Sequence, residues 1–242
     1  MRNVLALCAL AVLVSGCTAG TGHSAYYGVQ AETRISVGVE VGSTDVSWED
    51  GDEWDSTSYR PFLTVGSYAN GLAWDFLARG RFHEDAESDD LGSDVEHQAG
   101  DYRYRLGWGW ELPSATGLSL LTGPSYRHGR METELGTFKY DMFGWNLGAR
   151  LDQRLGSRLS LFVEAGGDYL LTGMATGELD RADADGGYAL GARAGLDFGL
   201  TKNLLLGGGV FYDYGWLDYT DDWETESEIR TTGAFVSITA RF

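Results

Sequence analysis

The chain has 242 residues, a formal net charge of −18, 43% hydrophobic residues and 13% aromatic residues. The apolar and aromatic contents exclude a disordered acidic segment, in which both would be low. The charge argues against nucleic acid as a partner, because phosphates would be repelled.

Residues 1–16 have the features of a secretory signal. A short cationic start, Met1-Arg2-Asn3, precedes an apolar run from Val4 to Val14 that contains Cys8 and is too short to span a bilayer as a helix. The chain is therefore expected to be exported.

The segment Val14-Ser15-Gly16-Cys17 resembles the bacterial lipobox, in which the cysteine thiol receives a diacylglyceryl group and becomes the mature N-terminus. The resemblance implies lipidation at Cys17, and Thr18 after it resembles the type directed to the outer membrane. The alternative is an ordinary signal peptide that is cut a few residues later, near Ala19.

These features divide the chain into a signal peptide at 1–16, a small polar tether at 17–31 and a single barrel domain at 32–242. Because Cys8 would leave with the signal and Cys17 would carry lipid, no cysteine is left for a disulfide, a metal site or a nucleophile.

From Ile35 onward the hydrophobic period is two, which is the signature of β-strands. The longest example runs from Tyr102 to Leu112, where aromatic residues and leucines alternate with Arg, Gly and Glu. Ten such runs predict strands at 34–47, 57–68, 72–83, 98–112, 118–129, 138–152, 159–172, 187–200, 204–218 and 229–242.

The connections between these runs alternate in character. Four are short and carry no acid, at 70–71, 113–117, 156–157 and 201–203. The other five are longer and hold 23 of the 36 acidic residues. This pattern favours an all-β fold, a ten-stranded antiparallel transmembrane β-barrel with eight or twelve strands as alternatives. The long acidic loops are expected outside the cell, and the short turns and both termini in the periplasm.

The chain end supports the same architecture. Val236, Ile238, Ala240 and the final Phe242 alternate with polar or small residues, and this segment resembles the C-terminal β-signal of bacterial outer-membrane proteins. The resemblance implies recognition by the barrel-assembly machinery. Outer-membrane lipid and lipopolysaccharide are the other expected partners, and the protein is expected to be a monomer of the Gram-negative cell envelope.

The polar face of the strands is unusually charged. Alternation predicts that nine basic and nine acidic side chains point inward: Arg60, Arg79, Arg81, Arg103, Arg105, Arg127, Arg150, Arg193, Arg241, Glu40, Asp75, Asp101, Glu111, Asp152, Glu164, Asp168, Asp197 and Asp213. Since a ten-stranded barrel is only slightly wider than one that side chains fill, these groups are expected to meet as an ion-pair network. An ion or solute path through the network is the alternative.

Ten strands are also the number in the omptin proteases, whose outer loops carry an Asp pair and a His-Asp pair. His83 and Asp85 at the end of one predicted strand, and His97 at the start of the next, are similar in kind and are the only catalytic candidates. The connection at 174–187 contains no histidine, so the His-Asp partner of that family is missing. Ser125 and His128 are three residues apart, which puts them on opposite faces of a strand and argues against a lipase-like pair.

No cofactor is expected, and no specific metal site. Aligning Asp183, Asp185 and Gly186 with a calcium loop puts Arg181 at the first ligand position and Ala192 at the twelfth, which are both wrong. Loosely bound Ca²⁺ or Mg²⁺ at the acidic loops is compatible with the clustered carboxylates. The alternative that the acidity reflects a saline habitat stays open.

The function predicted from these features is that of an outer-membrane β-barrel surface protein with acidic extracellular loops. Its role is expected to be non-enzymatic, either structural in the envelope or adhesive. The alternatives are an omptin-like surface hydrolase and a narrow, porin-like channel.

Overall fold

The computed structural model describes residues 33–48, 53–68, 71–88, 92–113, 115–133, 136–176, 181–221 and 225–242. The predicted signal, the whole of the tether with Cys17, and the tips of the acidic connections lie outside these residues. Ten strands are present: β1 (Thr33–Trp48), β2 (Glu53–Ser67), β3 (Gly71–Ser88), β4 (Gly92–Leu112), β5 (Thr116–Thr133), β6 (Gly136–Arg154), β7 (Leu159–Thr176), β8 (Arg181–Gly199), β9 (Leu204–Asp221) and β10 (Thr225–Arg241).

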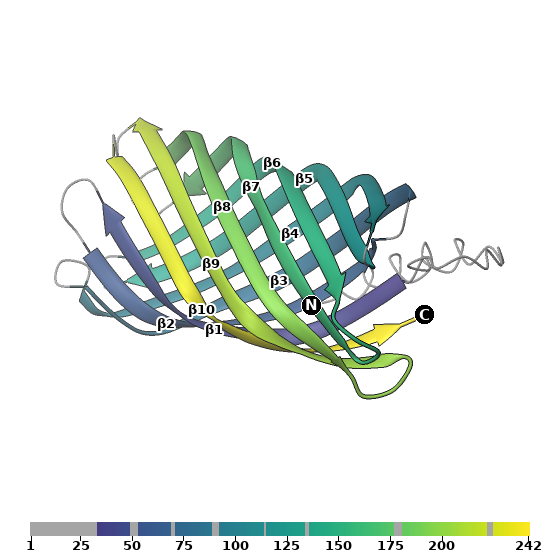
Figure 1. Cartoon of the computed structure of the whole chain (residues 1–242). Coiled ribbons are helices and arrows are strands. Elements are labelled where there is room, and N and C mark those ends of the chain that lie inside the picture. Colours follow the sequence, from purple (N-terminus) through teal and green to yellow (C-terminus); the bar gives the residue numbers. More distant parts are fainter. Residues whose placement is uncertain are drawn as a thin grey trace.

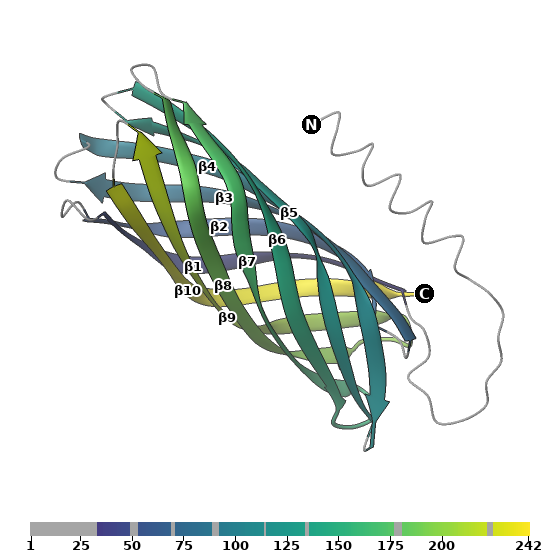
Figure 2. The same ribbon diagram turned by 90° about the horizontal axis from the view of Figure 1, so that it is seen from above.

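The strands form one closed antiparallel barrel in which each strand pairs with its neighbours in sequence and β1 pairs with β10. Figure 1 shows the yellow β10 beside the purple β1, and in Figure 2 the strands wrap obliquely around the barrel. The closure is in register from Arg34 opposite Arg241 to Trp48 opposite Ser227. The predicted ten-stranded all-β barrel is confirmed, and the alternatives of eight and twelve strands are wrong.

The strands extend further than the sequence pattern predicts, mainly at one end of the barrel. β3 continues to Ser88 instead of residue 83, β4 begins at Gly92 instead of 98, and β8 begins at Arg181 instead of 187. Hydrophobic alternation stops where the outward face becomes polar, whereas the ladder of backbone hydrogen bonds needs no apolar residues to continue. Part of the predicted acidic loops is therefore strand.

The four short connections lie at the opposite end. Gly71 has φ of +105° at the start of β3, where a Cβ atom would meet no other atom within 4 Å, so glycine is needed there for its backbone conformation. Ala115 also has positive φ, 54°, in the turn from β4 to β5. At this end Phe242 donates its backbone N–H to the carbonyl oxygen of Thr33 over 3.0 Å, which joins the chain end to the first strand.

The two faces of the barrel wall differ sharply. Large apolar side chains are exposed on the outer face, for example Leu147 (65% exposed), Leu72 (63%) and Val210 (61%), whereas Glu40 and Arg105 have no exposed surface inside. No helix among the described residues has the length and apolar character needed to cross a membrane.

Candidate functional site: the charged barrel interior

The interior is organised around arginine side chains that share carboxylates. Arg105 from β4 has no exposed surface and lies against Asp75 of β3, to which it donates from Nε over 2.9 Å and also from Nη2. The same Nη2 lies 2.7 Å from Glu164 of β7. Glu164 also accepts from Arg103 over 3.0 Å, and Arg150 lies 3.5 Å away. Four strands are thereby linked across the lumen.

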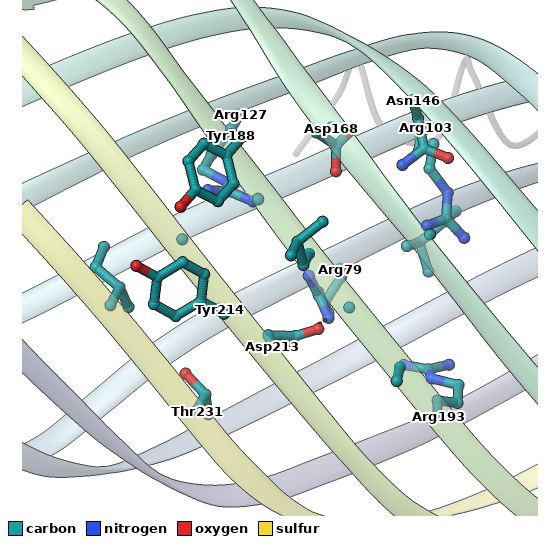
Figure 3. Close-up of a pocket in the computed structure, with 18 of the residues that line it drawn as sticks. Arg79, Arg103, Arg127, Asn146, Asp168, Tyr188, Arg193, Asp213, Tyr214 and Thr231 are labelled. Atoms are coloured by element: carbon teal, nitrogen blue, oxygen red, sulfur yellow. Dashed lines mark hydrogen bonds and ion pairs between the residues drawn. The ribbon is translucent and has the colours of Figure 1, made fainter.

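A second group gathers on Glu40 of β1, which has no exposed surface. Arg60 lies 3.3 Å from its carboxylate, Arg79 lies 3.4 Å away, and Arg193 pairs with the other carboxylate oxygen. Arg60 and Arg79 also contact Asp213 of β9, at 2.5 and 3.2 Å. In Figure 3 the side chains of Arg79 and Asp213 point toward one another across the pocket.

Asp101 of β4 is the acceptor for three arginines. Arg127 donates to it from Nε over 2.6 Å, Arg79 lies 2.9 Å away, and Arg81 lies 3.5 Å away. At the short-turn end Asp152 is paired with Arg150 at 2.9 Å and with Arg34 at 3.0 Å. Counting the described interior residues, nine arginines share six carboxylates, so each of the carboxylates except Asp75 bridges at least two cations.

Aromatic rings fill the space between the charged groups. Phe62, Phe162, Phe211 and Phe235 form a buried cluster with Leu77. The guanidinium of Arg60 lies 4.3 Å from the ring centre of Phe211, and Arg150 lies 4.5 Å from that of Phe162. Guanidinium groups stack favourably on such rings. The rings of the cluster and the arginines stacked on them pack together inside the barrel.

A cavity of about 90 Å³ remains on the loop side of this cluster, between an arginine wall and a glycine-lined wall. Arg79, Arg103 and Arg127 line the first wall, and Gly191 and Gly215 the second. Since one water needs roughly 10–15 Å³ of such space, the cavity has room for several water molecules. Asp168 projects into it in Figure 3, and its buried Oδ1 has no hydrogen-bond partner among the described atoms.

Three of the residues predicted for the network stand apart from it. Asp168, Asp197 and Glu111 form no ion pair with any described residue at a distance of 4 Å or less. Asp197 lies close to Gly207, where a Cβ atom would be only 2.6 Å from its carboxylate oxygen. The remaining predicted residues except Arg241 take part in the ion pairs described above.

The structure brings the two candidate catalytic histidines together. His83 of β3 is directly opposite His97 of β4, on the long-loop side of Phe82. Their ring centres are 4.6 Å apart. His83 Nδ1 lies 2.7 Å from the hydroxyl of Ser56, and His97 Nε2 lies 2.8 Å from the hydroxyl of Tyr140. Asp85 lies in β3, and its side chain is outside the described part. His128 is on the outer face, where it stacks on Tyr102 and Tyr126.

Burial decides what this histidine pair can do. Desolvation, with the positive charge of Arg81 nearby, lowers the pKa of His83 to about 2 and that of His97 to about 3. A ring with so low a pKa is a poor proton acceptor near neutral pH. The hydrogen bond between Ser56 and His83 therefore suits a structural link between β2 and β3 better than an activated nucleophile.

Arg34, Tyr68, Ser56 and Tyr140 are among the interior residues that sequence reasoning missed. Arg34 and Tyr68 have the inward phase of their strands, so alternation alone would have found them at the strand ends. Tyr68 donates to Asp75 over 3.2 Å and lies under Arg150, with 4.6 Å between the guanidinium and the ring centre. Ser56 falls in a predicted loop, and Tyr140 is aromatic, so neither carried a signal for an inward polar role.

No group of three or more His, Cys, Asp or Glu side chains within the described ranges is arranged to hold a metal ion. Arg181 of the calcium-loop comparison begins β8, and Ala192 lies in its middle, so the compared segment is strand.

Comparison with known proteins gives structural neighbours only. No protein-family model matches the chain, and no curated protein matches its sequence. Among solved structures, the outer membrane protease OmpT from Escherichia coli has a TM-score of 0.56 at 11% identity, over 92% of this chain and 100% of that one. Neisserial surface protein A has a TM-score of 0.44 at 14% identity, over 86% of this chain and 97% of that one. The likeness to OmpT extends over nearly the whole of both chains and shows a shared barrel fold.

Proposed function

We propose that this protein is an outer-membrane β-barrel with a sealed interior, and that it acts through the acidic segments at its long-loop end in a non-enzymatic surface or envelope role. The observation that carries the proposal is the inverted distribution of side chains, with apolar groups outside and ion pairs inside.

A bilayer explains the outer face. Leu72, Leu147, Val210 and Val236 are each at least half exposed, and they belong to different strands around the barrel. A continuous apolar belt of this kind is unfavourable in water and favourable against lipid. Strands of 15 to 21 residues are longer than the roughly 9–11 that cross a bilayer, so their ends would project beyond it.

Aromatic side chains support the same placement. Trp108 and Phe198 are exposed near the short turns, whereas Phe82 and Tyr212 are exposed toward the long connections. Two such girdles are typical of the interfaces on either side of a membrane barrel. The orientation follows from loop length, with the long connections outside and both ends of the barrel domain in the periplasm.

The acidic connections give the proposed surface role its chemistry. Carboxylates that face the phosphates of the outer leaflet would be repelled unless divalent cations bridge them, so contacts of this surface are expected to depend on Ca²⁺ or Mg²⁺. Export by the signal, lipidation at Cys17 and recognition of the last strand by the assembly machinery belong to the same proposal.

Heat-modifiable mobility tests the proposal. The outer-membrane fraction is run on SDS gels with and without boiling, because a closed membrane barrel resists SDS until it is heated. We expect a faster band in the unheated sample. A single mobility, together with release of the protein once its lipid is removed, would contradict a membrane barrel and indicate a tethered soluble one.

The surface hydrolase is the second candidate, and the contact between Ser56 and His83 is the observation that keeps it testable. Purified barrel is incubated with a fluorogenic peptide mixture and with a fluorogenic ester. Under the proposed function, the unmodified barrel cleaves neither substrate faster than the Ser56→Ala and His83→Gln variants do. Cleavage that both substitutions abolish would establish the hydrolase instead.

A further inference from the structure

The outer face of the barrel is not uniformly smooth. A furrow with a volume of about 630 Å³ lies across β2 to β6 at the level where the apolar belt ends. Ligand pockets typically measure about 300–1,000 Å³, so the furrow is large enough to hold part of a small molecule.

Small residues form the floor of the furrow. Gly80 of β3 is directly opposite Gly100 of β4, and the ring of Pro61 lies beside Gly80. A Cβ atom on Gly80 would approach the ring of Phe82 to 3.3 Å, and one on Gly100 would meet the His128 ring at 2.5 Å. The ring of His128 packs directly onto Gly100, so the missing side chain at Gly80 is what leaves the wall hollow.

The sides of the furrow are apolar. Phe82 bounds it on the loop side, while Leu63, Ala78 and Tyr102 bound it on the side of the short turns. Phe82 is 45% exposed, which leaves its ring available to a second molecule. Floor and walls together suit a hydrocarbon chain lying against the barrel.

Cations stand at one end of the furrow. Arg130 of β5 is directly opposite Lys139 of β6, and both line it. The chain has only two lysines, and Lys139 forms no ion pair with any described residue. Arg130 is 55% exposed and contacts Glu132 at 2.5 Å, which leaves other N–H groups of its guanidinium available. Asp141 also lines this end, and its carboxylate accepts a hydrogen bond from the hydroxyl of Tyr126.

We propose that this furrow binds one lipid of the surrounding membrane, with an acyl chain along Gly80 between Leu63 and Phe82 and a phosphate of its headgroup between Arg130 and Lys139. The inference rests on the proposed membrane placement. Two adjacent cations match the charge and the acceptor oxygens of a phosphate, and the apolar walls match the chain attached to it. In a chain of net charge −18, cations side by side at the edge of an apolar furrow favour an anionic ligand there.

The test uses the full-length barrel in detergent and native mass spectrometry, with dioleoyl phosphatidic acid as the phosphate-bearing probe and dioleoyl phosphatidylcholine as the zwitterionic one. We expect one tightly held phosphatidic acid per barrel. The Arg130→Gln/Lys139→Gln variant is expected to bind it about tenfold more weakly, because two charge-assisted hydrogen-bonding groups are lost. Gly80→Leu, which fills the furrow, is expected to weaken it similarly.

The matched control is Arg158→Gln/Lys202→Gln, which removes the same charge from exposed positions at the short turns and is expected to leave binding unchanged. Equal binding of both lipids, equal loss in the control, or a dimer that Gly80→Leu abolishes would each overturn the lipid site. Heat-modifiable mobility is measured on the same samples. If the mobility shift persists while lipid binding fails, only the furrow is misassigned, whereas loss of the shift contradicts the membrane barrel itself.

Discussion

Arg105 shows how single residues hold the interior together. Its side chain has no exposed surface and neutralises Asp75 and Glu164, which come from strands on either side of the lumen. Replacing it by methionine keeps much of the volume and removes the charge. We expect Arg105→Met to lower the free energy of unfolding by about 3–5 kcal/mol, because two carboxylates lose a buried partner. Urea unfolding of the barrel in lipid vesicles measures this.

The control for that substitution is an exposed pair of the same type. Arg230 contacts Glu228 at 2.6 Å but is 57% exposed, so water replaces the interaction at little cost. Arg230→Met is expected to leave the free energy of unfolding nearly unchanged, because surface ion pairs contribute little. Equal effects at the two positions would show that the interior network is not the main source of stability.

The histidine pair predicts a pH dependence. In the unfolded chain each ring has a pKa near 6.5, whereas burial lowers the pKa of His97 to about 3 and that of His83 to about 2. Below pH 6.5 the unfolded chain therefore takes up protons that the folded barrel does not. Stability is complete above pH 6.5 and falls as the pH decreases toward 3.

Urea unfolding between pH 7 and pH 4 checks this dependence. Each histidine is expected to contribute up to about 1.4 kcal/mol per pH unit below its unfolded pKa. The His83→Gln/His97→Gln variant should show a flatter profile, since its carboxylates titrate as before and only the two rings are gone. Identical slopes would mean that the rings take up protons in the folded barrel.

At the scale of elements, the seam between β1 and β10 depends on two facing glycines. Gly42 is directly opposite Gly233, and a Cβ atom on Gly233 would lie 2.6 Å from the Cα of Gly42 and 2.8 Å from the ring of Phe211. We expect Gly233→Val to prevent closure, since backbone atoms would have to move. Unheated SDS gels would then lack the fast-migrating form. Thr232→Val is the control, because this neighbouring side chain is on the exposed outer face.

Alternation predicts strands well only where the two faces of the wall differ in polarity. β7 begins at Leu159 and β9 at Leu204, as the pattern predicts, because apolar and polar residues alternate from their first residues. The same pattern cannot follow β3 to Ser88, since Glu84 and Asp85 are both polar and the pairing of β3 with β2 and β4 shifts register beyond His83.

For the interior, phase predicts which side chains point inward but not which of them meet. Arg79 and Asp213 are far apart in sequence and touch only because the barrel closes. The contact between His83 and Ser56 depends on the register of β2 against β3, which no local signal contains. The local sequence pattern determines whether a side chain points into the barrel. The register between strands and the curvature of the sheet determine which side chains contact one another.

At the scale of the whole molecule, the interior decides whether the barrel conducts. The buried rings of Phe62, Phe162, Phe211 and Phe235 occupy the middle of the lumen, and guanidinium groups are stacked on them. A charge-lined lumen of ten strands is little wider than its side chains require. We therefore infer that the ion pairs and rings act together as one plug.

This inference gives a conductance prediction. In planar lipid bilayers the unmodified barrel is expected to give no stable current steps, whereas Phe62→Gly/Phe235→Gly should give discrete openings, because Arg193 stacks on both rings and loses both supports. Val236→Ala, next to Phe235 and half exposed on the outer face, is the control and should stay silent. If the unmodified barrel conducts as strongly as the double variant, water and ions already pass between the rings, and the narrow channel replaces the sealed barrel as its function.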